Sequence, residues 1–316
     1  MNPSNYSIII GAVLLVSPLA TPVRADILYV SNNNDSTITN IASDGGDSVF
    51  ADSGANVPEG LAFDAAGNLY VASFLDSTIV KFTPGGVSSV FASSGVSNPF
   101  GLAFDRAGNL FVANVGSRTI FKFTPDGVGS LFASTGLNPA ISLAFDSADN
   151  LYAGVVNDNT IVKYTPGGVG SVFASSGVFG PSGLAFGPAG DLYVANYGND
   201  TIAKFPPGGV GSIFANTGLN APSGLAFDSA GNLYAANNRD STIAKFTPGG
   251  VGSVFANSGL SNPAFLAFTT DAGVPLLAPS AIPEPSTWAM FALGLAVLPG
   301  LRRIGRRSAQ VDATPA

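Results

Sequence analysis

Short apolar stretches alternate with turn residues along most of this chain, and the alternation repeats every 41 residues. In one repeat the runs rich in Val, Ile, Phe and Tyr are residues 61–63, 69–73, 78–83 and 89–92, and Gly, Pro, Asp or Asn separate them. Short runs of this composition without helical periodicity predict β-strands, here named a to d in chain order. Four strands in each repeat are typical of one blade of a β-propeller.

Aromatic residues keep the period without any insertion. The three series are Phe63, Phe104, Phe145, Phe186, Phe227 and Phe268; Tyr29, Tyr70, Phe111, Tyr152, Tyr193 and Tyr234; and Phe50, Phe91, Phe132, Phe173, Phe214 and Phe255. Six copies predict six units, each of which buries its apolar faces against its neighbours.

The two ends of the repeat region complement each other. The first strand b, at Leu28, has no strand a before it, and the last strand a, at 266–268, has no complete blade after it. The C-terminal run would therefore be the inner strand of a blade whose outer three strands come from 27–52, which removes the open sheet edges. A linear β-solenoid would need end caps of different composition. We predict an all-β, six-bladed propeller over residues 26–275.

Both ends of the chain indicate export. The apolar run 7–20, followed by Val23-Arg24-Ala25, predicts a signal peptide of residues 1–25 cut by signal peptidase, with a first core strand as the alternative. Pro283-Glu284-Pro285 lies in a predicted linker, 276–287. A short transmembrane helix and an Arg cluster that includes Arg302 and Arg303 are predicted over 288–307, and a tail over 308–316. The apolar run is shorter than the ~20 residues of a stable span.

This three-part C-terminus resembles the PEP-CTERM sorting signal of Gram-negative bacteria. The resemblance implies transient anchoring in the inner membrane, cleavage by an exosortase near Pro-Glu-Pro, and delivery to the cell surface or the extracellular matrix. A plain membrane anchor is the alternative. The repeat P-x-G-L-A-F-D-x-A-G-N-L-Y-V-A-N resembles the NHL repeat and, more distantly, the virginiamycin B lyase-like and gluconolactonase-like six-bladed propellers. Propellers host many functions, so this second resemblance implies the fold rather than an activity.

The amino-acid composition limits the catalytic and metal-binding groups that the chain can offer. The chain has no His and no Cys, so it lacks the commonest general base and metal ligand and cannot form a disulfide. Residues 26–282 contain 18 acidic and eight basic residues, a net charge of −10, which argues against binding to nucleic acid. All five Lys occupy one repeat position, which favours a structural role; a stripe that binds acidic polysaccharide is the alternative.

Candidate ligand-binding residues lie in the loops between strands b and c. In propellers these loops share a face with the d–a loops, and this face usually binds the ligand. The residues that differ among the b–c loops are Asp76, Arg118, Asp158, Tyr197, Asp200, Arg239 and Asp240. Relaxed turn sequence is the alternative explanation, because Asn, Asp and Gly suit any short turn.

A second candidate site is the mouth of the central channel. The residue before the strand-a Gly should face it, which gives a ring of Glu59, Phe100, Ile141, Ser182, Ser223 and Ala264. Acidic and amide residues at such positions hold a divalent metal in gluconolactonase-like propellers. We predict no cofactor, with a weak divalent cation site at Glu59, Asn114, Asn196 and Asn237 as the alternative. The lack of His departs from the metal-site pattern of the lyases.

Together these features predict an exported, non-catalytic, monomeric propeller that binds carbohydrate or another protein, with exopolysaccharide or a matrix protein as partner. No catalytic residue is assigned, because no Ser has a base beside it and no pair of carboxylates is evident. The alternatives are a degenerate lactonase- or lyase-type enzyme and a purely structural matrix protein.

Overall fold

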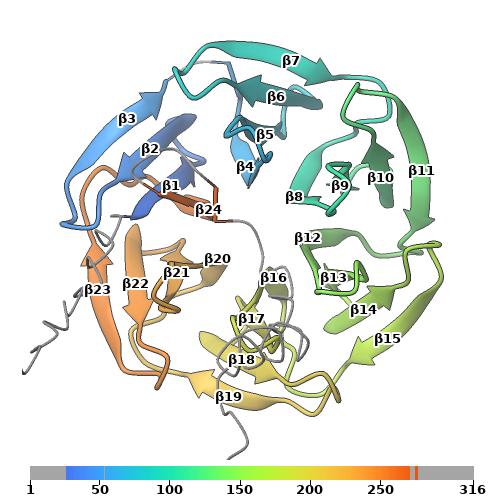
Figure 1. Cartoon of the computed structure of the whole chain (residues 1–316). Coiled ribbons are helices and arrows are strands. Elements are labelled where there is room, and N and C mark those ends of the chain that lie inside the picture. The colour runs from blue at the N-terminus through green and yellow to red at the C-terminus, as the bar shows by residue number, and fades with distance from the viewer. Residues whose placement is uncertain (1–25, 53, 271–274, 277–316) are drawn as a thin grey trace, which may run out of the picture.

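The computed structural model describes residues 26–52, 54–270 and 275–276, and these form six four-stranded antiparallel sheets arranged around a central axis (Figure 1). The blade that closes the ring contains β24 (Pro263–Thr270), β1 (Asp26–Asn32), β2 (Thr37–Ile41) and β3 (Asp47–Ala51). We call it the closing blade and call the other five the contiguous blades.

The contiguous blades follow in chain order. The first two comprise β4 (Pro58–Phe63), β5 (Leu69–Ser73), β6 (Thr78–Phe82), β7 (Ser88–Ala92), β8 (Pro99–Phe104), β9 (Leu110–Asn114), β10 (Thr119–Phe123) and β11 (Gly129–Ser134). The third comprises β12 (Ala140–Phe145), β13 (Leu151–Val155), β14 (Thr160–Tyr164) and β15 (Gly170–Ala174). The last two comprise β16 (Pro181–Phe186), β17 (Leu192–Asn196), β18 (Thr201–Phe205), β19 (Ser212–Ala215), β20 (Pro222–Phe227), β21 (Leu233–Asn237), β22 (Thr242–Phe246) and β23 (Gly252–Ala256).

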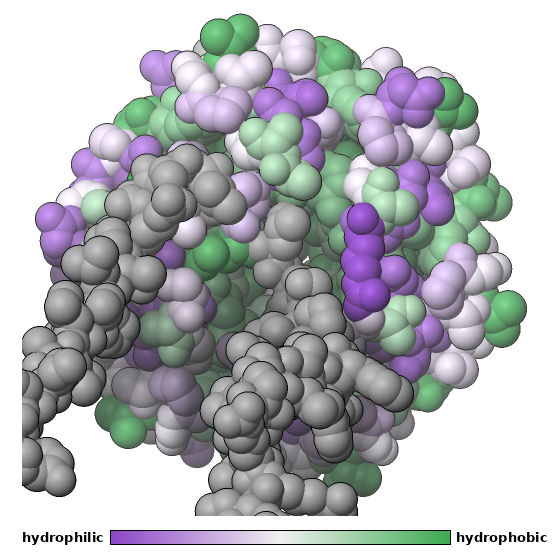
Figure 2. All heavy atoms as spheres, in the orientation of Figure 1, coloured by the Kyte–Doolittle hydropathy of each residue, from purple (hydrophilic) through white to green (hydrophobic). Residues whose placement is uncertain are grey.

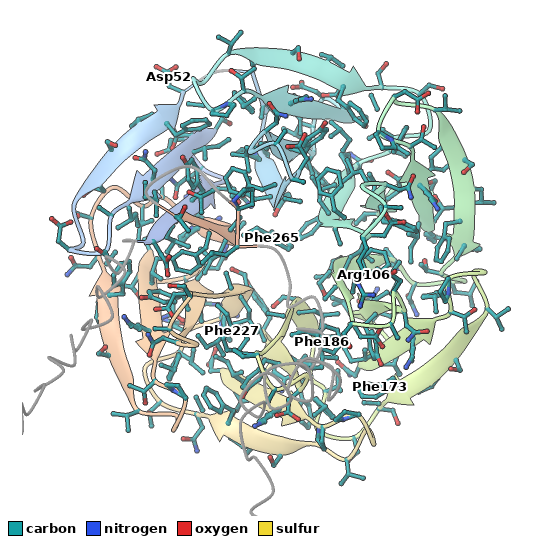
Figure 3. All side chains as sticks on the ribbon, viewed as in Figure 1. Asp52, Arg106, Phe173, Phe186, Phe227 and Phe265 are labelled. Atoms are coloured by element: carbon teal, nitrogen blue, oxygen red, sulfur yellow. The ribbon has the colours of Figure 1, made fainter. Side chains whose placement is uncertain are left out.

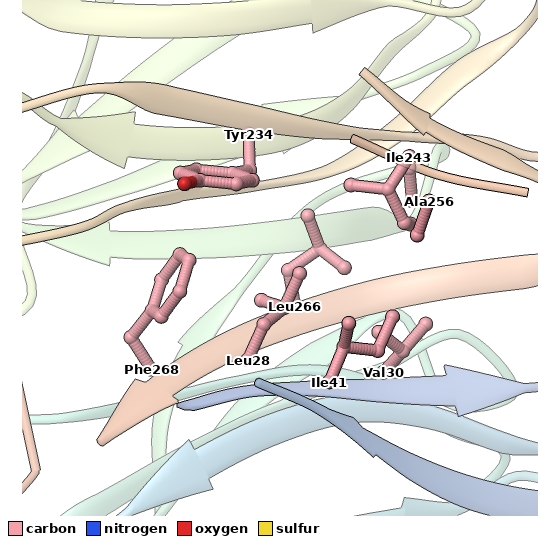
Figure 4. Close-up of a cluster of buried hydrophobic side chains, with 9 residues drawn as sticks. Leu28, Val30, Ile41, Tyr234, Ile243, Ala256, Leu266 and Phe268 are labelled. Atoms are coloured by element: carbon pink, nitrogen blue, oxygen red, sulfur yellow. The ribbon is translucent and has the colours of Figure 1, made fainter. Parts of the chain in front are cut away.

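The predicted closure of the ring is confirmed. Strand β24 pairs antiparallel with β1, with Val30 opposite Leu266 and Leu28 opposite Phe268. These side chains are buried together with Tyr234 of the neighbouring blade (Figure 4). The ends of the repeat region are therefore joined by strand pairing and apolar packing, and a linear solenoid is ruled out.

The three aromatic series meet at the junctions between blades. Tyr29 of β1 contacts Phe50 of its own blade and Phe63 of the next blade edge to face, each with ring centroids 5.1 Å apart. Equivalent trios recur in every blade, with centroids 4.9–5.1 Å apart. Each such pair stabilises the fold by roughly 0.5–1.5 kcal/mol beyond its buried area, which explains why the three positions keep the period.

The five Lys side chains have a structural role. The Lys81 ammonium lies 5.3 Å from the centroid of the Tyr70 ring and 3.8 Å from an oxygen of Asp64, which begins the a–b turn. The other four Lys repeat this arrangement. In the fourth contiguous blade Gly187 replaces the turn Asp, and Asp191 supplies the carboxylate instead, 2.8 Å from Lys204. These Lys are therefore part of the blades, as the sequence indicated.

Strand a begins earlier than the sequence predicted. β4 starts at Pro58, three residues before the predicted start at 61, and its pairing with β5 shifts register between Pro58 and Leu61. The irregularity contains Glu59 and Gly60. Near the axis the inner strands approach closely: a Cβ on Gly101 would lie 2.7 Å from the carbonyl oxygen of Ile141. In the four blades that have Gly at this position, the close contact between neighbouring inner strands leaves no room for a side chain.

The outer strand of each blade leaves one sheet edge open to solvent. Apolar residues recur on this rim and are well exposed, among them Val90, Val172 and Val254. Figure 2 shows apolar residues spaced around the circumference. β-Branched side chains suit an extended edge strand, so the pattern follows from strand formation.

Candidate functional site

The b–c and d–a loops lie side by side on one face of the ring. The backbone N–H groups of Tyr197 and Gly198, which follow β17, donate to the carbonyl oxygens of Gly180 and Phe179, which precede β16, at 3.1 and 3.0 Å. Similar bonds join Asn33 to Asn262, Phe74 to Val57, Val115 to Asn98, and Asn238 to Ala221. Paired loops therefore surround one end of the central channel.

A cavity of about 650 Å³ opens at this end. All six residues of the ring predicted from the sequence line it: Glu59, Phe100, Ile141, Ser182, Ser223 and Ala264. Phe179 and Phe265 add aromatic surface, and Asn33, Asn238 and Asn262 add amides. The wall therefore combines apolar surface with hydrogen-bonding groups, as ligand sites commonly do.

Glu59 is the buried acid of this cavity. Its side chain is 5% exposed, and Oε1 accepts a hydrogen bond of 2.8 Å from Nδ2 of Asn33. Oε2 has no hydrogen-bond partner among the described residues. Burial raises the pKa of Glu59 from its ordinary value of 4.5 to about 8, although the bond from Asn33 acts in the opposite direction. The carboxyl group is therefore largely protonated at neutral pH in the free protein.

Phe265 is a cavity residue that the sequence analysis missed. It occupies the repeat position held by Gly60, Gly101, Gly183 and Gly224 in four other blades and by Ser142 in the fifth, and it lies beside the central opening (Figure 3). Its ring centroid is 5.7 Å from that of Phe100. Ser31 departs from the repeat as well, and its hydroxyl accepts the N–H of Phe265 at 2.9 Å. Aligning the repeats at the strand-a Gly would have revealed this departure.

Tyr197 and Arg239 are brought together from adjacent blades. Tyr197 follows β17 and lines the cavity, with 36% of its surface exposed. The guanidinium carbon of Arg239, which lies between β21 and β22, is 5.3 Å from the centroid of the Tyr197 ring. The stack holds a partly exposed aromatic ring at the edge of the cavity.

Three of the predicted carboxylates accept hydrogen bonds within their own blades. Asp76 accepts a bond from the Ser73 hydroxyl at 2.8 Å, and Asp240 accepts one from the Thr242 hydroxyl at 2.8 Å. Asp158 accepts one from the Asn138 amide at 2.6 Å. All three side chains are exposed and none of them lines the cavity. Their contacts are those of residues that organise turns.

Asp200 and Arg118 occupy the same repeat position. In five blades the side chain at this position accepts a backbone N–H from the next blade. Asp200 accepts the backbone N–H of Ala221 in the next blade at 2.6 Å. Equivalent bonds run from Val57, Asn98, Gly180 and Asn262 to Ser36, Ser77, Asn159 and Ser241, respectively. Arg118 has no acceptor to offer at this position, and the residue equivalent to Ala221 is Pro139, which has no N–H. The missing acceptor at Arg118 is therefore matched by the missing N–H at Pro139.

The amides proposed as metal ligands are hydrogen-bonded within their own blades and do not line the cavity. The Asn114 oxygen accepts the N–H of Ser97 at 3.0 Å, and its nitrogen donates to the carbonyl of Gly95 at 2.9 Å. Asn196 and Asn237 bind their own d–a loops in the same way. Within the described part of the chain no three His, Cys, Asp or Glu side chains gather to hold a metal. Ca²⁺ takes six to eight oxygens, so these residues do not form a fitting donor set with Glu59.

Residues 281–307 match the model of the PEP-CTERM protein-sorting motif. The chain carries this sorting signal. The motif implies export, sorting to the cell surface in a Gram-negative bacterium, and processing by an exosortase. The match includes Pro283, Glu284, Pro285, Arg302 and Arg303.

Several predictions for the chain ends concern residues outside the described range. These are the signal peptide 1–25, the span and Arg cluster 288–307, the tail 308–316 and nearly all of the linker 276–287. No helix among the described residues has the length and apolar character needed to cross a membrane.

Solved structures show the same fold. A chain of a nidogen–laminin complex is 19% identical, with a TM-score of 0.70 over 77% of this chain and 98% of that one. Staphylococcus aureus virginiamycin B lyase, solved as an inactive variant with quinupristin, is 15% identical, with a TM-score of 0.59 over 80% and 94%. A Xanthomonas campestris gluconolactonase is 17% identical, with a TM-score of 0.60 over 81% and 96%. No curated protein matches the sequence.

Proposed function

We propose that this chain is a non-catalytic propeller of the cell surface or extracellular matrix that binds carbohydrate at the channel mouth. The observation that carries the proposal is the wall of the cavity, where aromatic rings lie beside amide groups. A sugar ring has apolar C–H faces and hydroxyl groups at its edge, so it needs both kinds of surface. The sorting motif supports the proposal because it implies delivery to the compartment where exopolysaccharide is found.

Tyr197 is the residue best placed to stack on a sugar. It is partly exposed, it lines the cavity, and Arg239 supports its ring. Asn238 and Asn262 lie in the same wall, and their amide nitrogens make only long bonds of 3.4 Å to other groups. These amides can therefore exchange weak internal contacts for ligand hydroxyls.

The hydroxyl groups in the cavity support binding rather than catalysis. Ser182 donates to the carbonyl oxygen of Pro222 at 2.7 Å, and Ser223 donates to that of Pro263 at 3.1 Å. Both serines thus connect neighbouring inner strands and have no base as a partner. Glu59 supplies the one carboxyl group among the described residues of the wall, whereas hydrolysis of a glycosidic bond needs two.

The test measures binding of the purified protein to immobilised polysaccharides, including the exopolysaccharide of its own cell, and to matrix proteins. We expect polysaccharide binding to weaken at least tenfold in Tyr197→Ala and Arg239→Ala. Asp126→Asn, in the turn between β10 and β11, should bind like the native chain. Binding to matrix protein alone would replace the carbohydrate proposal with a protein partner.

The same preparations are assayed on lactones and glycosides, with and without Ca²⁺ or Mg²⁺. We expect no turnover. Turnover that is lost in Glu59→Gln would overturn the non-catalytic proposal and favour a degenerate lactonase- or lyase-type enzyme.

A further inference from the structure

We propose that the cavity selects an amino sugar, whose protonated amine binds Glu59. This inference rests on the proposed carbohydrate function and adds to it a class of ligand. The starting point is the carboxyl group itself. It is almost fully buried, it borders the cavity, and Oε2 is without a hydrogen-bond partner among the described residues.

When the carboxyl group is ionised, the unpartnered oxygen needs a donor from outside the described chain. Native proteins rarely leave a buried carboxyl oxygen unpaired, because the lost hydration is not recovered. Asn33 donates to the other oxygen only. An ammonium group has three N–H donors and a positive charge, so it satisfies Oε2 and stabilises the ionised carboxylate at once.

No Lys or Arg side chain among the described residues forms an ion pair with Glu59. None of the ion pairs among the described residues includes Glu59, and each of the five Lys is paired with the carboxylate of an a–b turn. The acidic body also attracts cations towards the ring. A cationic ligand is therefore favoured over an anionic one.

Other titratable groups near Glu59 are few. The strands packed against β4 are β5, β8, β24 and β1. β8 and β24 contain no titratable side chain. Tyr70 on β5 lies opposite Ala62, and Asp26 on β1 lies opposite Thr270, at the end of β24 remote from Pro263. Tyr29 pairs with Ala267 in the middle of that strand. Tyr197 also lines the cavity.

The surroundings of Glu59 suit a sugar that carries the amine. Phe100 follows Glu59 in the ring of six, and Phe265 lies against it with centroids 5.7 Å apart. Such rings accept both a sugar face and a neighbouring cation. A lysine side chain from a protein would use Glu59 and the rings but would leave the amides of Asn238 and Asn262 without a ligand hydroxyl. The mixed wall therefore favours the amino sugar.

The experiment compares a β-linked glucosamine trisaccharide with its N-acetylated counterpart by calorimetric titration of the full chain at pH 7.0, where part of the amino groups is charged and part of the Glu59 carboxyl can ionise. We expect the native chain to bind the amine form at least tenfold more tightly. Glu59→Gln keeps the shape of the side chain but not its charge, so it should bind the two forms alike. Asp35→Asn, an exposed carboxylate in the same loop as Asn33, should keep the native preference and so controls for general attraction.

A second measurement does not depend on a variant that folds. In carbon-detected NMR the pKa of the Glu59 carboxyl should fall when the amine form is added and should stay unchanged with the N-acetylated form. Equal binding of the two sugars by the native chain, or a preference that survives in Glu59→Gln, would overturn the inference while leaving the carbohydrate function standing. If the chain binds neither sugar and no polysaccharide but does bind a lysine-rich peptide, the proposed function is overturned as well.

Discussion

The closing blade and the five contiguous blades share the aromatic trio but differ in the residues that surround it. Each contiguous blade has a Lys above its strand-b ring and a carboxylate beside that Lys. The closing blade has Asn40 and Thr269 at the corresponding positions, so it lacks both partners. Its aromatic trio is nevertheless intact, with Tyr29 against Phe50 and Phe63. Aromatic packing is therefore the constant part of a blade, and the ion pair is an addition to it.

The same comparison separates two kinds of departure from the repeat. Some departures in the contiguous blades compensate each other locally: Asp191 replaces the carboxylate missing at Gly187, and Pro139 accompanies Arg118. Other departures meet at the cavity, as Asn33 and Phe265 of the closing blade do. A departure from the repeat is therefore a candidate for function where several of them meet.

Removing the inner strand of the closing blade should have the largest effect. A chain that ends at Asn262 loses β24 and with it buried Leu266 and Phe268, worth about 1.5–3 kcal/mol each. It also exposes the edge of β1, which promotes aggregation. We expect no stable monomer by size-exclusion chromatography and thermal unfolding. A chain that ends at Leu276 keeps β24 and should remain monomeric; equal behaviour of the two chains would contradict the closure.

Single core positions test whether the closing blade is weaker than the rest. Leu266 is 6% exposed and its equivalent Leu225 is 7% exposed. Substitution of either by Ala should lower the free energy of unfolding by about 2–5 kcal/mol, because each leaves a cavity between blades. Chemical denaturation should give two losses that agree within ~1 kcal/mol. A much smaller loss at Leu266 would show that the closing strand is loosely packed.

Two acid groups of the contiguous blades, Glu59 at the cavity and Asp146 in an a–b turn, should give pH dependences of opposite sign. The raised pKa of Glu59 contributes stability that is present below pH 4.5 and is lost as the pH rises to about 8. For Asp146, burial is outweighed by bonds from Asn150 and the charge of Lys163, so its pKa is lowered. Its contribution is lost as the pH falls below 3.8. In denaturation curves Glu59→Gln should remove a loss on the order of 5 kcal/mol between pH 4.5 and about 8, and Asp146→Asn should not.

The bonds between loops of neighbouring blades should have the smallest effect. Ser241→Ala removes the acceptor for the N–H of Asn262 at the junction with the closing blade and should cost about 0.5–1.5 kcal/mol. Arg118→Ala changes the same repeat position, at a similar positive φ, where the facing residue is Pro139. It should leave the free energy of unfolding within about 0.5 kcal/mol of the native value. Equal losses would show that Arg118 has a structural contact of its own.

Much of the fold was predictable because each blade repeats the same local information. Strands b, c and d lie within one residue of the predicted runs in the repeat 60–100, since turn residues mark their ends. The predicted start of strand a is wrong by three residues, because proline can begin a strand beside a register shift. That difference places Glu59 inside β4.

The 41-residue period is enough to predict the number of blades, the closure by a C-terminal strand and the ring of six residues at the channel mouth, because all three follow from a fixed spacing. Which of the irregular residues meet becomes visible only in the folded ring. Asn33 reaches Glu59, Arg239 covers Tyr197, and Phe265 lies against Phe100 across blades that are distant in the chain. Such contacts depend on how inner strands converge on one axis, and spacing along a single chain does not encode which side chains are then buried without a partner.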